Sequence, residues 1–191
     1  MRIKCCGITR PEDARFAEQA GADAIGVVMF SNSSPRSVSV TVAQDIFHSV
    51  GPLITTVVVT QTTSESDLAR ILEIKPDAIQ ISHPFMFRRD PGVRIIRAIR
   101  PENPLPDDCD AIVVDDSQGG GKPFGRSFAR DAVTRSKVPV ILAGGLTPEN
   151  VGEAIREIHP YAVDVATGIE RSPGIKDPDK IRAFIAAVLE V

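Results

Sequence analysis

The chain has 191 residues, of which 42% are hydrophobic and 25% are charged, and its formal net charge at pH 7 is −3. This composition is typical of a globular protein with a full core, and the length predicts a single domain over residues 1–191. Because Lys and Arg are scattered and the apolar runs reach only about seven residues, we expect neither a nucleic-acid partner nor a membrane span.

The cysteines and the beginning of the chain indicate the compartment. Met1 leads directly into a strand pattern, without the basic and apolar regions of a secretory signal. Three cysteines are an odd number, and Cys5 and Cys6 are neighbours, which does not fit a disulfide framework or zinc-ligand spacing. We therefore expect a cytoplasmic protein without a bound metal.

Short β-rich apolar runs alternate along the chain with polar segments of helical period, a pattern typical of parallel βα units. In chain order we predict a strand at 2–6, a helix at 11–20, a strand at 24–30, a helix at 40–50, a strand at 53–59, a helix at 64–74, strands at 77–82, 93–99 and 109–115, a helix at 127–135, a strand at 138–143, a helix at 148–158, a strand at 162–166 and a helix at 177–189. Pro11 and Gly21 flank the first helix, and Ser64 is a suitable N-cap with Asp67 three residues on.

Eight strands, nearly all joined by crossovers, favour an α/β fold of the (β/α)8 TIM barrel type over an open sheet. The fourth and fifth strands are each followed by only about ten residues, too few for a full crossover helix. Pro101, Pro104 and Pro106 disfavour a helix in the second of these segments. We therefore predict a minimal barrel, with helices four and five shortened or replaced by loops.

Cys6 stands where the active site of such a barrel lies, at the carboxyl end of a strand. Alternate residues of a strand point to opposite faces, so Lys4 and Cys6 share one face and Ile3 and Cys5 the other. Because a Lys is disfavoured under the helix layer, we expect Lys4 and Cys6 to point into the barrel. A thiol beside a cation can have a depressed pKa and act as a nucleophile or base, which is one interpretation of Cys6. An inert buried cysteine is the alternative, and Cys5 should be one.

Two further charged residues follow predicted strands. Asp115 ends an all-apolar strand, where a carboxylate is either a catalytic acid or base or a cap for the next loop. The glycine-rich run 119–122 after it indicates either a loop that covers a substrate or a plain loop. Arg36 lies in a Ser-, Asn- and Pro-rich loop, as a solvated turn residue or as a bidentate holder of a carboxylate or phosphate.

Two loops of small residues predict a phosphate site. Gly144 and Gly145 follow the seventh strand, and Thr167 and Gly168 follow the eighth, where one loop opens a short extra helix. Loops in these two positions form the common phosphate site of barrels, because backbone N–H groups at a helix start attract a dianion.

Several motifs at matching spacing extend this interpretation over the whole chain. They are KCCGITRPED (4–13), GADAIG (21–26), SPR (34–36), LAGGLTPENV (142–151) and VDVATGIE (163–170). Together they resemble the phosphoribosylanthranilate isomerases of tryptophan biosynthesis.

The resemblance implies an Amadori rearrangement of N-(5-phosphoribosyl)anthranilate to 1-(2-carboxyphenylamino)-1-deoxyribulose 5-phosphate, without cofactor or metal. It implies that Cys6 is the general base acting on the sugar C2′ proton and that Asp115 is the general acid acting on the ring oxygen. Arg36 would hold the anthranilate carboxylate, the two glycine loops the phosphate, and Asp164 a sugar hydroxyl or a neighbouring side chain. We expect a monomer or homodimer.

The chain departs from the family pattern at three places. Ser82 and His83 displace the usual His by one position, Thr60 replaces the usual Asn, and Gly125 and Arg126 replace an Asp-Trp pair. These positions could all line the anthranilate side of the site.

Two alternative functions stay open. A related aldose–ketose isomerase, of the histidine pathway or with dual substrates, needs two phosphate sites and paired aspartates, whereas the sequence shows one such site and a Cys. A non-catalytic phosphosugar-binding barrel is the other, and the presence of both Cys6 and Asp115 argues against it.

Overall fold

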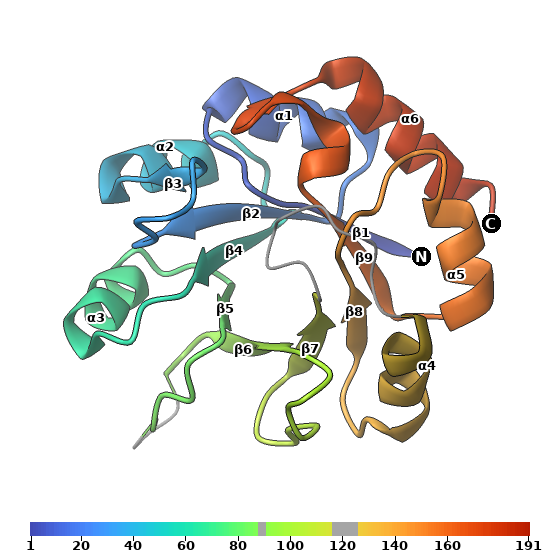
Figure 1. Cartoon of the computed structure of the whole chain (residues 1–191). Helices are drawn as coiled ribbons and strands as arrows, with labels where there is room; N and C mark the ends of the chain where they lie inside the picture. The colour runs from blue at the N-terminus through green and yellow to red at the C-terminus, as the bar shows by residue number, and fades with distance from the viewer. Residues whose placement is uncertain (88–90, 116–125) are drawn as a thin grey trace.

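A computed structural model describes residues 1–87, 91–115 and 126–191, and within these ranges eight parallel strands close into a barrel (Figure 1). The strands are β1 (Arg2–Cys5), β2 (Ala24–Met29), β4 (Thr55–Thr60), β5 (Ala78–Ile81), β6 (Arg94–Ile99), β7 (Ala111–Val114), β8 (Val140–Leu142) and β9 (Ala162–Val165). Their order is β1-β9-β8-β7-β6-β5-β4-β2, and the additional pairing of β1 with β2 closes the ring. The predicted barrel is confirmed.

Six helices of the described ranges lie around the outside of this barrel (Figure 1). They are α1 (Pro11–Ala20), α2 (Val40–His48), α3 (Glu65–Glu73), α4 (Arg126–Arg135), α5 (Val151–Ile158) and α6 (Pro178–Leu189). Gly21 ends α1 in the left-handed region at φ 108°, as a C-terminal glycine should. Ser64 caps α3 by accepting a hydrogen bond from the Asp67 N–H at 3.3 Å, which confirms the predicted cap.

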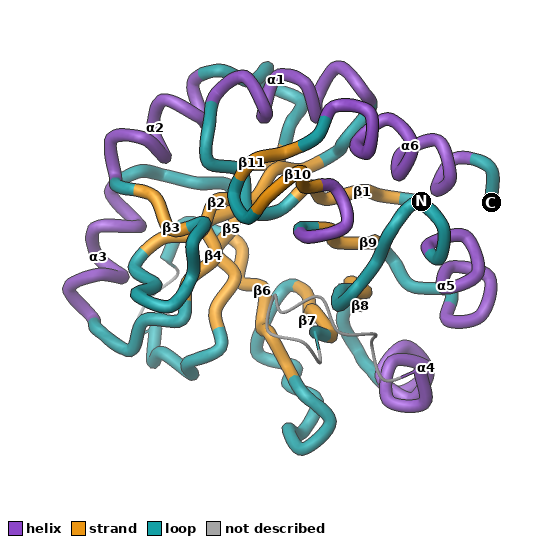
Figure 2. Tube along the Cα trace, turned by 45° about the horizontal axis from the view of Figure 1, so that its top comes forward, coloured by secondary structure: helices purple, strands orange, loops and turns teal. Residues whose placement is uncertain are grey.

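The described residues that follow β5 and β6 contain no helix, as predicted for this minimal barrel (Figure 2). The strands are shorter than expected: β4 begins at Thr55, since Leu53 lies outside the sheet with 92% of its surface exposed, β7 begins at Ala111, β8 spans only Val140–Leu142, and the other strands lose one or two residues at their ends. Some small elements were not predicted. These are β3 (Ser37–Val38), which pairs with β2, and the antiparallel pair β10 (Glu170–Ser172) and β11 (Ile175–Lys176). The short extra helix after the eighth strand is η1 (Thr167–Ile169).

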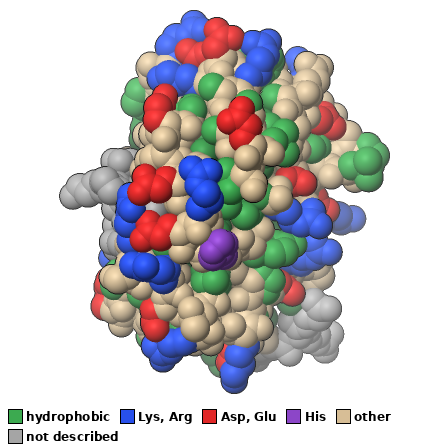
Figure 3. Space-filling view, turned by 90° about the vertical axis from the view of Figure 1, so that its right-hand side faces the viewer, with side chains coloured by type: hydrophobic (Ala, Val, Ile, Leu, Met, Phe, Trp, Pro, Cys, Tyr) green, Lys and Arg blue, Asp and Glu red, His purple; other side chains and the backbone are tan. Residues whose placement is uncertain are grey.

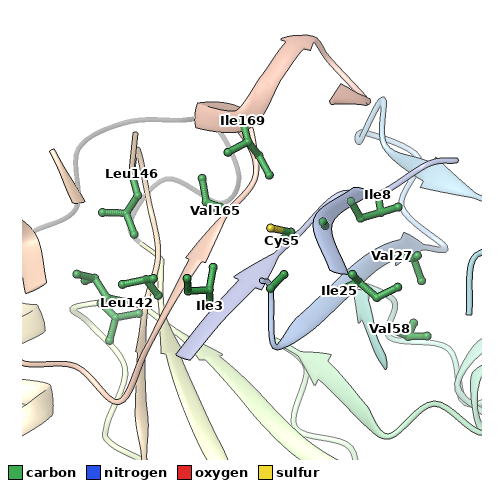
Figure 4. Packing of buried hydrophobic residues seen from close by; sticks show 14 of the residues in the cluster. Ile3, Cys5, Ile8, Ile25, Val27, Val58, Leu142, Leu146, Val165 and Ile169 are labelled. Atoms are coloured by element: carbon green, nitrogen blue, oxygen red, sulfur yellow. The ribbon is translucent and has the colours of Figure 1, made fainter. Parts of the chain in front are cut away.

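The apolar core has two layers, which follow from the alternation of side chains along each strand. The larger layer lies between barrel and helices and includes Ile3, Cys5 and Val165 (Figure 4). A smaller cluster fills the barrel interior with short side chains such as Val57 and Ala78. Cys5 therefore faces the helix layer, as predicted, and the residues on either side of it face inward.

The outer surface mixes charges of both signs. Figure 3 shows acidic and basic side chains interspersed on the side of the molecule where α5 lies. Three ion pairs join α4 to α5: Arg126 binds Glu153 at 2.9 Å and Glu157 at 2.7 Å, and Arg130 binds Glu157 at 3.5 Å. Among the described residues, no helix is both long and apolar enough to cross a membrane.

Candidate active site

A cavity of about 670 Å³ opens at the carboxyl ends of the strands, a size that suits a small-molecule ligand. Most of the predicted site residues line it, although they come from distant parts of the chain. These residues are Cys6, Arg36, Asp115, Gly144, Gly145, Asp164 and Thr167. The barrel thus brings both proposed proton-transfer groups and both glycine loops to one cavity.

A buried ion pair links the first strand to the last beneath this cavity. Lys4 Nζ donates hydrogen bonds to Asp164 Oδ2 at 2.8 Å and to Gln80 Oε1 at 3.0 Å. Burial alone would lower the pKa of Lys4, but the neighbouring Asp164 and Cys6 raise it above its ordinary value, so the ammonium stays charged. Asp164 Oδ1 is buried and accepts no hydrogen bond from the described residues.

Cys6 lies one residue past β1, where its N–H still donates to Val165 O at 2.8 Å. Its thiol is buried next to Lys4. The two side chains share their space because residue 26 is Gly: a Cβ there would stand 2.9 Å from Cys6 Sγ and 3.1 Å from Lys4 Cε. The shared inward face predicted for Lys4 and Cys6 is confirmed.

The thiol pKa, however, differs from the prediction. Burial raises the pKa of Cys6 and the charge of Asp164 raises it further, while Lys4 and Lys176 only partly oppose this. Of the two alternatives that the sequence left open for Cys6, the depressed thiol pKa is contradicted, because desolvation and the Asp164 carboxylate outweigh the cation beside the thiol. In the ligand-free protein Cys6 is therefore a neutral thiol near neutral pH.

Asp115 directly follows β7 and is half-buried at the cavity wall. It follows a strand three places around the barrel from the strand that Cys6 follows, since β8 and β9 lie between β7 and β1. The glycine-rich run 119–122 and Gly125 lie outside the described residues.

Arg36 is not a solvated turn residue, since its side chain is only 11% exposed. Its Nε and Nη2 donate to the two carboxylate oxygens of Glu170, both at 2.7 Å. Sequence reasoning gave Glu170 no role of its own. The two residues are 134 positions apart in the sequence. The only sequence feature that could have pointed to Glu170 was its position at the end of the motif VDVATGIE (163–170).

The two glycine loops touch one another. Gly144 and Gly145 have left-handed φ values of 93° and 62°, which favour glycine. Gly168 does not line the cavity; it lies against the first loop, and a Cβ at this position would overlap the carbonyl oxygen of Leu146. Asn150 holds the first loop by donating to Gly145 O at 2.9 Å.

The three departures from the family pattern have different positions. Thr60 and Ser82 line the cavity, as expected. His83 does not; its ring packs edge-on against Phe85 with 4.7 Å between ring centroids. Arg126 is on the exposed side of α4 and pairs with α5, so the expectation that it lines the anthranilate side was wrong. In the described ranges, no three His, Cys, Asp or Glu side chains are grouped so as to hold a metal ion.

Comparison with known proteins gives consistent matches over the whole chain. The sequence model of the family described as N-(5′phosphoribosyl)anthranilate (PRA) isomerase matches residues 3–187. A protein of Methanoregula boonei named N-(5′-phosphoribosyl)anthranilate isomerase is 63% identical over 190 residues, which cover 100% of this chain and 97% of that protein.

Solved structures agree with the sequence matches. The phosphoribosyl anthranilate isomerase of Thermus thermophilus superposes with a TM-score of 0.86 at 31% identity, covering 100% of this chain and 99% of that one. A phosphoribosyl anthranilate isomerase in complex with reduced 1-(o-carboxyphenylamino)-1-deoxyribulose 5-phosphate superposes with a TM-score of 0.80 at 29% identity, covering 100% of both chains.

Proposed function

The chain belongs to the N-(5′-phosphoribosyl)anthranilate isomerase family, and we propose that Cys6 and Asp115 are the base and the acid of its reaction. It is an isomerase of tryptophan biosynthesis that converts N-(5′-phosphoribosyl)anthranilate to 1-(2-carboxyphenylamino)-1-deoxyribulose 5-phosphate. The single observation that carries the proposed roles is that both residues line one cavity together with the two glycine loops.

The chemistry needs two proton transfers at different sugar atoms. Asp115 donates a proton to the furanose ring oxygen, the C1′–O bond breaks, and the nitrogen lone pair forms the C1′=N bond. The Cys6 thiolate then removes the C2′ proton, and the C2′–H electron pair forms a C1′=C2′ double bond while the C1′=N electrons return to nitrogen. The resulting enol tautomerises to the ketone. Because the two residues follow β1 and β7, they can reach different sides of the sugar.

Cys6 must lose its proton before it can act as a base. The raised pKa of the thiol in the ligand-free protein opposes this, and the charges of Lys4 and Lys176 favour it. We therefore assign Lys4 a supporting role, in which its ammonium lies beside the thiolate and is itself held by Asp164.

The remaining groups bind the substrate. Backbone N–H groups of Gly144, Gly145 and Thr167, which line the cavity, would hold the phosphate. Gly168 would contribute to phosphate binding from behind, through the close contact that it allows between the two loops. The unused Asp164 Oδ1 would accept a sugar hydroxyl, and Arg36 would bind the anthranilate carboxylate.

Inhibition by inorganic phosphate tests the phosphate site. Phosphate should compete with the substrate, and Gly145→Val should weaken that inhibition strongly, because a β-branched residue is strained at φ 62° and the loop would have to change its conformation. Arg171→Ala is the matched control: its side chain is 69% exposed, pairs with Asp177 and lies outside the cavity. Equal effects of the two variants would contradict the assignment.

We also propose that residues 1–191 act as one domain, because the strands from the two ends of the chain, β1 and β9, pair directly. The three free cysteines favour the reducing cytoplasm as the site of action. Light scattering after size exclusion distinguishes the monomer from the homodimer, the two states that we expect.

A further inference from the structure

Arg36 is held at the cavity by three neighbours from other parts of the chain. Glu170 accepts the Nε and Nη2 hydrogen bonds. Gly7, with φ 71°, lies under the aliphatic stem, where a Cβ would stand 2.5 Å from Arg36 Cδ. Lys176 lies behind Glu170, with its side chain fully buried and its Nζ 3.0 Å from Glu170 Oε1. The guanidinium therefore has little freedom to turn.

The pattern of donors decides what Arg36 can offer to a ligand. A guanidinium has five N–H donors on two bidentate edges, the side-on edge (Nε and Nη2) and the end-on edge (Nη1 and Nη2). Glu170 occupies the side-on edge. The end-on edge is the one that remains for a second carboxylate, and bidentate pairing of this kind is geometrically specific.

The Glu170 carboxylate is itself held by several hydrogen bonds, so we expect it to keep its position when a ligand binds. Its Oε1 also accepts from Lys176 Nζ and from the Gly174 N–H at 3.2 Å. Burial alone would raise the pKa of Glu170, but Arg36 and Lys176 hold it below its ordinary value, so the carboxylate stays charged. Lys176 Nζ is fixed in turn by Ala166 O at 3.1 Å, which lies directly before η1.

The charges of the cluster formed by Arg36, Glu170 and Lys176 affect how strongly it attracts an anionic ligand. Arg36 and Glu170 together are neutral and would offer little attraction to an anion. Lys176 lies in this buried cluster, where desolvation lowers its pKa and the Glu170 carboxylate opposes that shift. In its protonated form Lys176 adds a positive charge that water does not screen. The cluster thus combines a fixed bidentate edge with a buried group that is cationic when protonated.

We propose that Glu170, supported by Lys176, is a positioning residue that presents the end-on edge of Arg36 and thereby determines specificity for a substrate with an aryl carboxylate. This inference rests on the proposed function of Arg36 as the carboxylate holder. The competing possibility is that Arg36 leaves Glu170 when the substrate binds, in which case Glu170 would compete with the substrate.

Calorimetric binding of two ligands tests the inference without requiring turnover. The first ligand is reduced 1-(o-carboxyphenylamino)-1-deoxyribulose 5-phosphate, and the second is the same molecule with a plain phenyl ring. Glu170→Gln should weaken the first by about tenfold or more and the second by less than about twofold. On the first ligand, the double variant with Arg36→Met should bind no more weakly than Arg36→Met alone.

Glu153→Gln is the matched control, because it removes one carboxylate from an exposed arginine pair outside the cavity. It should leave both affinities unchanged. If Glu170→Gln does not fold, Lys176→Met provides the second test, because losing the hydrogen bond from Lys176 Nζ to Glu170 should weaken the carboxylate-bearing ligand more than the ligand with the plain phenyl ring.

Each outcome separates the inference from the proposed function. If Arg36→Met weakens both ligands equally, Arg36 does not hold the carboxylate, and the proposed function and the inference both fail at this point. If Arg36→Met discriminates between the ligands but Glu170→Gln weakens both equally, Glu170 has only a structural role and the inference alone fails. Tighter binding of the carboxylate ligand by Glu170→Gln would also overturn the inference, since it would show that Glu170 competes with the substrate.

Discussion

Alanine at position 168 would test how the two glycine loops hold a phosphate together. A Cβ on Gly168 would overlap the carbonyl oxygen of Leu146 and stand 3.0 Å from its carbonyl carbon and 3.1 Å from Thr147 Cα. Comfortable carbon–carbon contacts begin at about 3.5 Å. All of these atoms are backbone, so no rotamer change relieves the overlap, and the loops must separate by about 1 Å or more.

The cost of this separation follows from its size. Overpacking of this kind destabilises a fold by about 1–3 kcal/mol. For a chain of this length, each kcal/mol lowers the Tm by about 2–4 °C. The effect on function should be larger, because displacing a bound group by about 1 Å costs on the order of a hundredfold in rate. We therefore expect Gly168→Ala to lose about a hundredfold in kcat/KM and to bind inorganic phosphate more weakly.

Steady-state kinetics by anthranilate fluorescence, phosphate inhibition and thermal unfolding measure the three effects. Gly152→Ala is the control: it lies in α5, and its Cβ would be 3.4 Å from the nearest atom, Val191 Cγ2. It should leave the kinetics unchanged and stabilise the helix by up to about 1 kcal/mol. Normal phosphate inhibition in Gly168→Ala would refute the reasoning, since it would show that phosphate binding does not depend on the contact between these loops.

Three other predictions concern the titratable residues. Cys6→Ser and Asp115→Asn should each lower turnover by about a hundredfold or more with unchanged circular dichroism; a greater loss in Cys5→Ser would contradict the assignment of the base. Burial and Asp164 raise the pKa of Cys6, so kcat/KM should rise with pH above about 7. Asp164→Asn should move this rise to lower pH, because it removes a negative charge near the thiol. A move to higher pH would contradict this electrostatic account. The pKa of Glu170 in the folded protein is held below its unfolded value of about 4.3. The stability that the Glu170 carboxylate contributes is therefore present above about pH 4.3 and is lost as the pH falls through the pKa of the folded protein. In urea titrations, the difference in unfolding free energy between the wild type and Glu170→Gln should shrink on acidification, and a constant difference would refute this.

The barrel could be predicted from the sequence because the patterns that indicate its strands, helices and loops each lie within a few neighbouring residues. Strand alternation places Lys4 and Cys6 on the inner face, and the prolines after Arg100 disfavour a helix between β6 and β7. The glycine loops were located in the same way, since each stands directly after a recognisable strand. The rule that active sites lie at the carboxyl ends of barrel strands then selected most of the residues that line the cavity.

What escaped prediction depends on contacts between distant residues. Arg36 and Glu170 are 134 positions apart, and no local sequence pattern predicts that they pair. The thiol pKa of Cys6 depends on Asp164 and on burial, neither of which is visible in the surrounding sequence. The pair β10–β11 is too short to show a strand period, although it carries both Glu170 and Lys176.

The pairing of β1 with β9 also sets the order in which the protein becomes active. Lys4 and Asp164 lie 160 positions apart, and their hydrogen bond joins the first barrel strand to the last. During synthesis Lys4 and Cys6 emerge first, and their carboxylate partner emerges only when most of the chain has left the ribosome. A nascent chain that stops before β9 therefore carries its thiol without the ion pair beneath it. Because such long-range contacts form late, the site is completed only by closure of the barrel.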